Sequence, residues 1–316
     1  MADKLCVRDD PLLATLVLVV AGMAGFAAWS GWMWQGTGTE VMEMITPRGD
    51  TVALFGEGAY RHNAVFHALA YRAQDAVMAL ALVVALWAAL LMRGPRALAL
   101  LLAVLGFVVY GHASLALGAA LDWLFPAHVA ALSLGMFALW RAARGAKPGM
   151  KRPGLPRGML ALFLLIAGAG TFAVWGPQLF ADLTAQQTPA RMGVQTTLVT
   201  HALDLAVIAP LCLVAAVLVA RGQALGHVLA LPLIGILVFL LPTILLATGL
   251  QMQAGIEFTT VELVGPIGAM AVLGLLALWF LRYYMLALRP QPDPRSESPR
   301  ADTRPEADGA AATAAI

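Results

Sequence analysis

Long apolar runs dominate the chain and alternate with short polar segments. Eight runs predict helices, at residues 11–34, 75–92, 97–118, 124–140, 158–177, 199–220, 224–250 and 261–288. An α-helix needs about 20 apolar residues to cross a bilayer, so all eight can span one, some of them only with tilt or interfacial ends. The pattern therefore predicts an all-α membrane protein with eight transmembrane helices.

The positions of Lys and Arg predict how these helices are oriented. If the N-terminus is inside, 16 of the 20 basic residues are cytoplasmic, and the remaining four are Arg48, Arg61, Arg72 and Arg191. Positively charged segments resist translocation, so both termini are expected in the cytoplasm and the protein in the inner (plasma) membrane. Residues 1–10 and 143–157 then form a cytoplasmic tail and a basic cytoplasmic linker. Residues 289–316, rich in Pro, Arg and acids, are predicted to be a disordered cytoplasmic tail.

The largest predicted outer segment is the loop at residues 35–74. Residues 40–45 and 51–55, separated by the turn sequence TPRGD, predict a short β-hairpin. Residues 60–71 after it are typical of an amphipathic helix that lies at the membrane interface. Hairpin and helix together could cover the outer mouth of the bundle as a lid, or serve only as loop packing.

The two halves of the chain share a sequence pattern. Ala21-Gly22, Phe26-Ala27 and Trp29 recur 146 positions later, and Asp75 corresponds to Asp204. Four spans per half make this a parallel repeat, with residues 11–142 and 158–288 related by an axis along the membrane normal. The repeat also bears on the first run, which could otherwise be a cleaved signal peptide. Its predicted equivalent, the fifth run, lies mid-chain, which favours a retained helix.

Composition supports a membrane protein and excludes other classes. Of 316 residues, 60% are apolar and only 12% are charged, the mean hydropathy is +0.80 and the net charge is +2. Two ordinary soluble domains would carry about twice as many charged residues. A nearly neutral chain gives no basic field for nucleic acid. Cys6 and Cys212 do not form a disulfide framework or a zinc spacing.

Two segments resemble known sequences. GHASLALGAALDWLF (111–125) and ALDLAVIAPLCLVAAVLVARG (202–222) are similar to segments of bacterial multi-pass membrane proteins of no assigned function. The resemblance implies an uncharacterised bacterial membrane family, and it implies no activity, cofactor or catalytic residue.

Acidic residues collect near the predicted outer boundary. Asp75, Asp122, Asp204 and Glu262 each lie close to the outer end of a predicted span, and no charged residue falls at the bilayer centre. At the start of an inward-running helix a carboxylate is stabilised by unpaired backbone amides and the helix dipole. The alternative is that the four acids ring an outward-facing pocket for a cation or substrate. The empty midplane counts against ion-coupled transport, which needs a titratable group at depth.

Histidines provide a second set of candidate residues. His112 and His128 lie at similar depth on consecutive antiparallel spans, and His201 lies at the outer end of the sixth span. Two facing imidazoles can bind haem b or a transition metal, and either histidine can instead hydrogen-bond a neighbouring helix.

Three functions follow from these observations. The first is a non-enzymatic protein that binds or passes a small molecule or ion through an outward-facing pocket between the repeats, lined by Asp75, His112, Asp122, His128, His201, Asp204 and Glu262. The second is a membrane redox protein that binds haem or a metal through His112 and His128. The third is a structural or assembly subunit of a membrane complex, whose protein partners the sequence does not identify. Prolines 210, 232, 242 and 266 interrupt helices of the second half. Such kinks suit a moving transporter, but proline is common in membrane helices of every function.

Overall fold

The computed structural model describes residues 10–34, 41–146, 156–189 and 191–288. The predicted N-terminal and C-terminal tails, most of the basic linker, Cys6 and the first residue of the predicted hairpin lie outside these ranges. The first half contains α1 (Pro11–Met33), β1 (Val41–Ile45), β2 (Thr51–Phe55), α2 (Val65–Leu91), α3 (Pro95–Gly118) and α4 (Phe125–Ala146). The second half contains α5 (Arg157–Thr184), α6 (Val199–Leu203), α7 (Ala209–Ala220), α8 (Ala224–Gln253), α9 (Thr260–Glu262) and α10 (Gly268–Ala287).

Seven helical segments of the described chain are long and apolar enough to cross a membrane. They are α1, α2, α3, α5, the continuous segment Val199–Ala220, α8 and the segment Thr260–Ala287. The chain is therefore a multi-pass membrane protein by length and composition. α4 has 22 residues, about 33 Å of helix, but it carries His128, Arg141 and Arg144 and does not reach the same apolarity.

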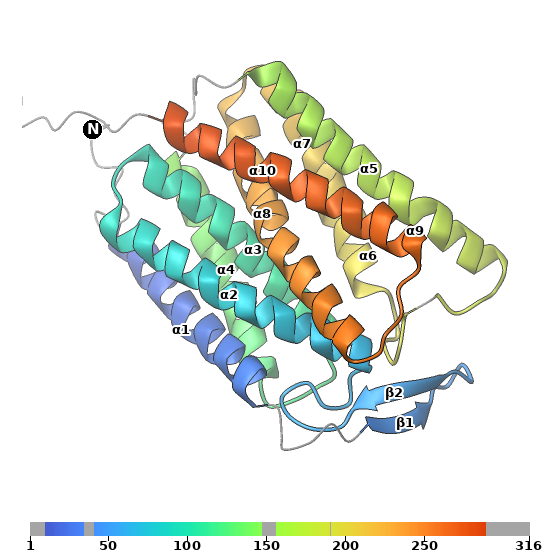
Figure 1. Cartoon of the computed structure of the whole chain (residues 1–316). Coiled ribbons are helices and arrows are strands. Elements are labelled where there is room, and N and C mark those ends of the chain that lie inside the picture. Colours follow the sequence, from blue (N-terminus) through green and yellow to red (C-terminus); the bar gives the residue numbers. More distant parts are fainter. Residues whose placement is uncertain (1–9, 35–40, 147–155, 190, 289–316) are drawn as a thin grey trace, which may run out of the picture.

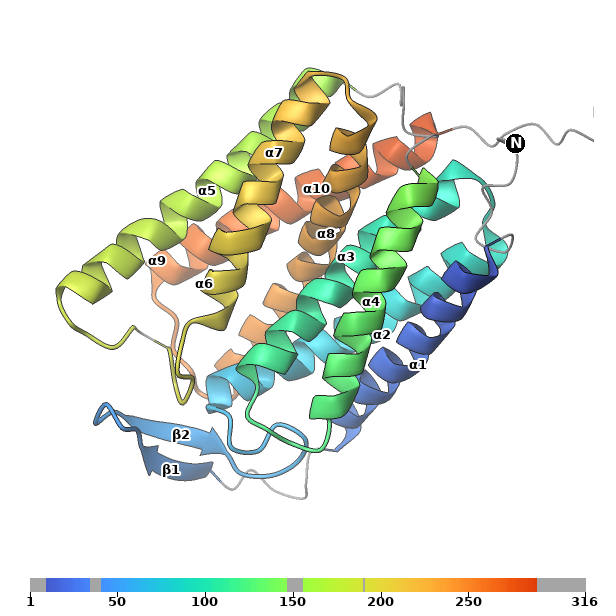
Figure 2. The same cartoon turned by 180° about the vertical axis from the view of Figure 1, so that it is seen from behind.

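The helices form two groups that share one buried interface. α1 packs against α2 and α4, and α3 packs against α2 and α4, which closes the first group. In the second group α5 packs on α7, α7 on α8, and α8 on α10. Figures 1 and 2 show the two groups side by side, with α3 and α8 between them. These two helices form the middle of the molecule.

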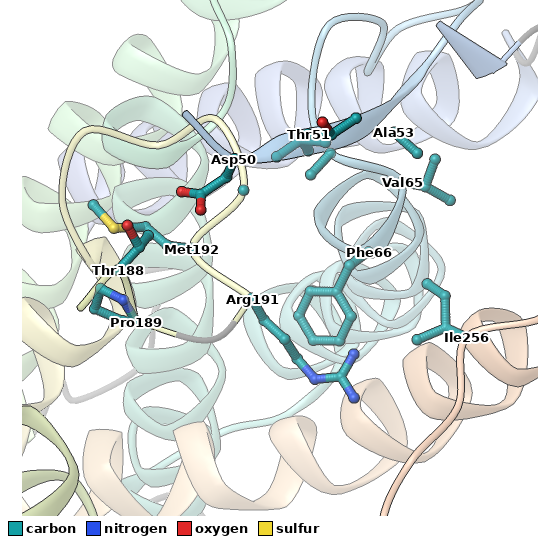
Figure 3. Close-up of a pocket in the computed structure, with 13 residues that line it drawn as sticks. Asp50, Thr51, Ala53, Val65, Phe66, Thr188, Pro189, Arg191, Met192 and Ile256 are labelled. Carbon is teal, nitrogen blue, oxygen red and sulfur yellow. The ribbon is translucent and has the colours of Figure 1, made fainter. Parts of the chain in front are cut away.

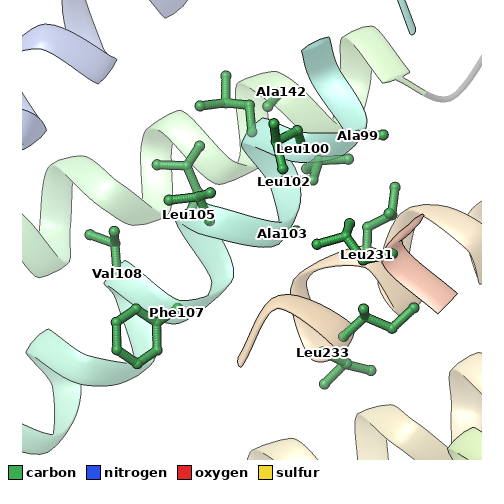
Figure 4. Close-up of a cluster of buried hydrophobic side chains, with 14 of the residues drawn as sticks. Ala99, Leu100, Leu102, Ala103, Leu105, Phe107, Val108, Ala142, Leu231 and Leu233 are labelled. Atoms are coloured by element: carbon green, nitrogen blue, oxygen red, sulfur yellow. The ribbon is translucent and has the colours of Figure 1, made fainter. Parts of the chain in front are cut away.

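The α3–α8 interface is close-packed because glycine lies at two crossing points. A Cβ atom on Gly106 would overlap the backbone and ring of Pro232, and one on Gly235 would overlap the Ala103 carbonyl. Leu102 and Leu105 of α3 and Leu231 and Leu233 of α8 belong to one buried cluster around these contacts (Figure 4). The rings of Phe107 and Phe239 stack with centroids 5.2 Å apart. Contact between the helix backbones replaces side-chain volume there, as is common between membrane helices.

The predicted hairpin is present, whereas the predicted interfacial helix is wrong. β1 and β2 pair antiparallel, with Val41 opposite Phe55 and Ile45 opposite Thr51. α2 begins at Val65, ten residues before the predicted start, and continues to Leu91 without a break. Residues 65–74 contain no Gly or Pro, and Ala68, Leu69 and Ala73 are buried. Core packing therefore continues along one helix, and the segment between α1 and α2 is shorter than the predicted loop 35–74.

Two helices of the second half contain a π-helical turn. One covers Asp204–Ile208 between α6 and α7, and the other covers Leu263–Ile267 between α9 and α10. Pro210 follows the first π-turn and Pro266 lies within the second, and neither proline has an N–H to donate to the preceding turn. π-turns inside longer helices are rare and frequently occur at functional sites.

Candidate functional site

The structure separates the predicted outer residues into several small clusters. We call the end of the bundle that carries β1 and β2 the hairpin end (Figure 1). Two of the acids there, Asp122 and Glu262, stabilise the start of a helix. Two others, Asp75 and Asp204, lie inside helices and are bound by tyrosine. The histidine pair forms a further cluster.

Asp122 and Glu262 have the capping geometry that their positions predict. The Asp122 carboxylate accepts a hydrogen bond from the Leu124 amide at 2.9 Å, just before α4. Burial raises the pKa of the Asp122 carboxyl group, and the Leu124 amide opposes this shift. Glu262 closes a capping box with Thr259 and forms an ion pair with Arg191, with Nε and Oε1 2.9 Å apart. Glu262 therefore satisfies both local backbone and charge, whereas Asp122 caps the backbone alone and its Oδ2 has no hydrogen-bond partner among the described residues.

The sequence predicted Asp75 at the start of a helix. Asp75 instead lies inside α2, because this helix begins ten residues earlier. Its carboxylate is 1% exposed and accepts a hydrogen bond of 2.6 Å from the Tyr60 hydroxyl. It also contacts the backbone at Gly31 of α1, where a side chain would overlap it. Burial, and then the nearby Asp75 charge, raise the pKa of Tyr60, so its hydroxyl stays protonated and donates. This pair links the outer segment to α1 and α2.

Asp204 is the predicted equivalent of Asp75, and it is bound differently. It opens the π-turn after α6 and accepts hydrogen bonds from the Tyr110 hydroxyl at 2.9 Å and from Trp175 Nε1 at 3.2 Å. The His201 ring packs on Trp175, with ring centroids 4.0 Å apart. Asp204 thus joins α3 and α5 to the π-turn, and it connects the two halves.

His112 and His128 face each other, as their predicted depths suggested. Their Nδ1 atoms are 3.2 Å apart, and the residues are 1% and 2% exposed. Within the described residues neither Nε2 atom has a hydrogen-bond partner. A direct hydrogen bond between the rings requires one Nδ1 to donate and the other to accept, so the two imidazoles adopt opposite tautomers.

Haem does not fit between these two rings. Two nitrogens on opposite sides of a metal with bonds of about 2.0 Å lie about 4 Å apart, and the porphyrin must separate the rings. At 3.2 Å the two Nδ1 atoms are at hydrogen-bond distance. The same separation fits two adjacent ligands of a tetrahedral ion, which are about 3.3 Å apart. Among the described residues no cluster of three or more His, Cys, Asp or Glu side chains could complete such a site.

A pocket of about 430 Å³ opens at the hairpin end, and none of the seven predicted residues lines it. Its first-half wall comes from β2, the turn before it and the start of α2, and its second-half wall from the segments before α6 and α9 (Figure 3). The lining side chains are Asp50, Thr51, Val52, Ala53, Ala64, Val65 and Phe66 from the first half, and Thr188, Pro189, Arg191, Met192, Gly193 and Ile256 from the second.

Arg191 is the pocket residue held by the most contacts. Its guanidinium lies over the rings of Phe66 and Phe258, 4.9 and 4.8 Å from their centroids. Nε donates to Glu262, and Nη2 donates to the Glu257 carbonyl at 2.9 Å. Figure 3 shows the Arg191 side chain extending beside the Phe66 ring. The sequence offered one signal for this residue, since Arg191 is one of four basic residues that break the predicted charge bias.

Side-chain hydrogen bonds join the hairpin turn to the second half of the chain near this pocket. Nη2 of Arg48 donates to the Gly193 carbonyl at 3.0 Å and to the Gln195 carbonyl at 3.3 Å. Nε2 of Gln195 in turn donates to the Tyr71 hydroxyl and to the Gly118 carbonyl. Segments from both halves therefore fix the geometry of the pocket wall.

Comparison of this chain with protein-family models, with curated proteins and with solved structures finds no match.

Proposed function

We propose that this protein resides in the plasma membrane with both termini cytoplasmic, and that it binds a small zwitterionic molecule in the outward-facing pocket at the hairpin end. The observation that carries the proposal is the composition of the pocket wall, to which both halves of the chain contribute. A site shared by two helix groups can respond to its ligand by a change in their relative position, as a facilitator or a sensor requires.

The proposed orientation follows from the charge bias and from the helix count. With eight spans, the 16 basic residues of the predicted cytoplasmic side face inward and the hairpin end faces out. α4 serves as the eighth span, because it packs against α1 and α3 within the same bundle. Its arginines 141 and 144 lie toward its C-terminal end, where a helix running inward reaches the cytoplasm.

The proposed repeat is supported by reciprocal contacts between α3 and α8, the third span of each half. Gly106 meets Pro232, and Gly235 meets Ala103. Gly235 follows Gly106 by 129 positions, and Pro232 follows Ala103 by the same 129. Exchange of the two halves therefore maps each contact onto the other, as a twofold axis between the helices would. Under this proposal the two walls of the pocket come from the two repeats.

The side chains of the pocket indicate the chemical class of the ligand. Arg191 offers to a carboxylate the guanidinium N–H groups that its bonds to Glu262 and the Glu257 carbonyl leave free. Asp50, whose Oδ2 lies 3.8 Å from Arg48 Nε, offers a carboxylate to an ammonium group. Val65, Phe66 and Ile256 add apolar surface between them. A free amino acid with an apolar side chain has all three complementary parts, and the volume is in the range of small-ligand sites, about 300–1,000 Å³.

Thermal unfolding of the detergent-solubilised full chain tests this proposal. The probes are leucine, its decarboxylated amine isopentylamine, and its deaminated acid isocaproate. Leucine is expected to raise the Tm and the two single-charge analogues to raise it much less, since a ligand at 100 times its Kd stabilises by about 2.7 kcal/mol. R191Q and D50N should each abolish the shift. R61Q, outside the pocket lining, is the matched control and should keep it.

Two results would overturn the proposal. One is the absence of a shift with leucine and with each of the other natural amino acids. The other is a shift of equal size in wild type, R191Q and D50N, which would locate the ligand elsewhere. A partner that co-purifies in stoichiometric amount, in place of a ligand response, would support the assembly-subunit alternative.

A second candidate function is metal binding by His112 and His128. The separation of the Nδ1 atoms is the observation that favours it, because 3.2 Å suits two ligands of a tetrahedral ion. The other ligands would have to be water or small molecules, because the described residues hold no cluster of three or more His, Cys, Asp or Glu side chains. Metal analysis of the purified protein tests this candidate. One equivalent of copper or zinc, lost in the H112N variant, would support it, and metal-free protein would exclude it.

A further inference from the structure

We propose that the chain holds one single-chain lipid with a hydroxyl head in a second cavity, which opens on the flank of the bundle between α4 and α7. This cavity has a volume of about 320 Å³ and shares no lining residue with the pocket at the hairpin end. Its walls come from α3, α4, α8 and the segment Val199–Ala220. It therefore lies between the two helix groups, midway along their length.

The cavity exists because small residues and a π-turn leave room between the helices. Ala113 of α3 and Ala143 of α4 form part of its lining, where larger side chains would fill it. On the opposite wall, Val207 and Ile208 belong to the π-turn of Asp204–Ile208. A π-turn inserts one extra residue and displaces the helix surface that follows it.

The mouth of the cavity faces the region that lipid occupies. Met136 and Trp140 of α4 and Val207 and Leu211 across from them line it and are 36–56% exposed. Figure 2 looks onto this flank, with α4 and α7 in front of α3 and α8. An opening here, within the span of the apolar helices, admits a chain from the bilayer without passage through water.

The chemistry of the walls selects an alkyl chain with one polar head. All lining side chains except Tyr110 and Trp140 are apolar, and none is charged. Water avoids an apolar cavity of this kind, whereas an alkyl chain recovers the lost contacts. The Tyr110 hydroxyl donates to Asp204 Oδ1, and Trp175 Nε1 donates to Oδ2. Tyr110 lines the cavity and Asp204 lies behind it, so the group that meets a lipid hydroxyl is the Tyr110 oxygen, which can accept a hydrogen bond while its own proton is donated to Asp204.

The proposed lipid therefore lies along α3, with its hydroxyl beside Tyr110 and Asp204 and its chain toward Leu102 and Ala143. A hydroxyl is preferred over an anionic head because the neighbouring charge is the carboxylate of Asp204. This assignment also gives the π-turn a role, since its Asp204 accepts the Tyr110 proton and its Val207 and Ile208 form part of the chain wall.

Photolabelling of the detergent-solubilised full chain tests the proposal. The probe is hexadecanol with a diazirine at the end of the chain, and the labelled peptides are mapped by mass spectrometry. Labels are expected to concentrate on the α4 and α8 residues that line the cavity. Excess hexadecanol should compete at least tenfold better than hexadecane in wild type, and about equally in Y110F.

Variants that fill the cavity provide the second measurement. A143F and A113L are expected to reduce labelling of the cavity peptides about tenfold. A269L, on an exposed position of α10 outside the cavity, is the matched control and should leave labelling unchanged. Labels spread over the exposed helix faces and unaffected by filling would overturn the proposal. Equal competition by hexadecane and hexadecanol in wild type would overturn the head-group assignment. This comparison uses the wild-type protein, so it does not depend on a variant that might fail to fold.

Discussion

At the scale of single residues, the four acidic side chains are of two kinds: two are bound by tyrosine, and two cap the start of a helix. Asp75 and Asp204 each accept a tyrosine hydroxyl inside the helical bundle, whereas Asp122 and Glu262 stabilise helix starts. A buried carboxylate loses its hydration, so the hydrogen bond that it accepts from its partner provides much of its stabilisation.

The Tyr60–Asp75 pair can be tested by removing one hydroxyl. Y60F is expected to lower the free energy of unfolding by about 1–3 kcal/mol, because Asp75 stays buried and loses a 2.6 Å hydrogen bond. Urea or heat unfolding in detergent measures this change. Y283F, at a tyrosine whose ring packs on Trp279, is the control and should cost much less. Equal losses in the two variants would contradict the assigned role of this hydrogen bond.

The histidine pair has a similar test with a different expected outcome. H112L leaves His128 buried with both ring nitrogens unpaired, so we expect a loss of about 1–3 kcal/mol in unfolding free energy. H128L should behave alike, and the double variant should lose less than the sum, because two leucines leave no orphaned polar atom. Additive losses in this double-mutant cycle would mean that the two rings do not interact.

At the scale of secondary-structure elements, apolar runs predicted where helices are but not where they begin. The apolar run at 75–92 predicted most of α2. The first ten residues of α2 were predicted as part of a separate interfacial helix, because Arg72 and His67 interrupt the apolar pattern there. Burial of Ala68, Leu69 and Ala73 decides the outcome, and burial depends on neighbours that are distant in sequence. The π-turns were not predicted either, although Pro210 and Pro266 mark them.

The contact between α3 and α8 gives a prediction for these elements. G235A and G106A are each expected to destabilise the protein by about 1–3 kcal/mol, because the added methyl overlaps backbone on the facing helix. G170A on α5 is the control, since a Cβ there has no neighbour within 4 Å and alanine favours a helix. Thermal unfolding measures all three. A G235A protein as stable as G170A would show that α3 and α8 are not in backbone contact.

At the scale of the whole molecule, hydropathy predicts a membrane protein but does not show which of its helices are buried in the interior. The segments Pro95–Gly118 and Thr260–Ala287 share a mean hydropathy of 2.1, yet the most apolar part of the first is 94% buried and that of the second only 17%. Lipid and protein core select the same side chains, so one sequence alone cannot distinguish the central helix from a peripheral one. For the same reason the pocket at the hairpin end could not be predicted, since its walls meet only through the packing of the two halves.

The proposed orientation and the eighth span are tested together by cysteine accessibility in intact cells. The background is C6S, because the native Cys212 is buried. Single cysteines replace Glu43 in β1, Leu121 between α3 and α4, Lys151 in the linker and Gln223 between α7 and α8. A membrane-impermeant maleimide is expected to label E43C and L121C directly, and K151C and Q223C only after permeabilisation.

Each position tests a different part of this topology. Glu43 and Leu121 belong to the hairpin end, and both should be outside if the positively charged segments stay in the cytoplasm. Lys151 follows α4, so its protection shows that α4 crosses the membrane despite its arginines. Labelling of K151C in intact cells, with L121C also labelled, would leave seven spans and place α4 on the outer surface. The reverse labelling pattern at all four positions would mean that the protein has the opposite orientation and that the pocket faces the cytoplasm. The proposed ligand would then have to be an intracellular molecule.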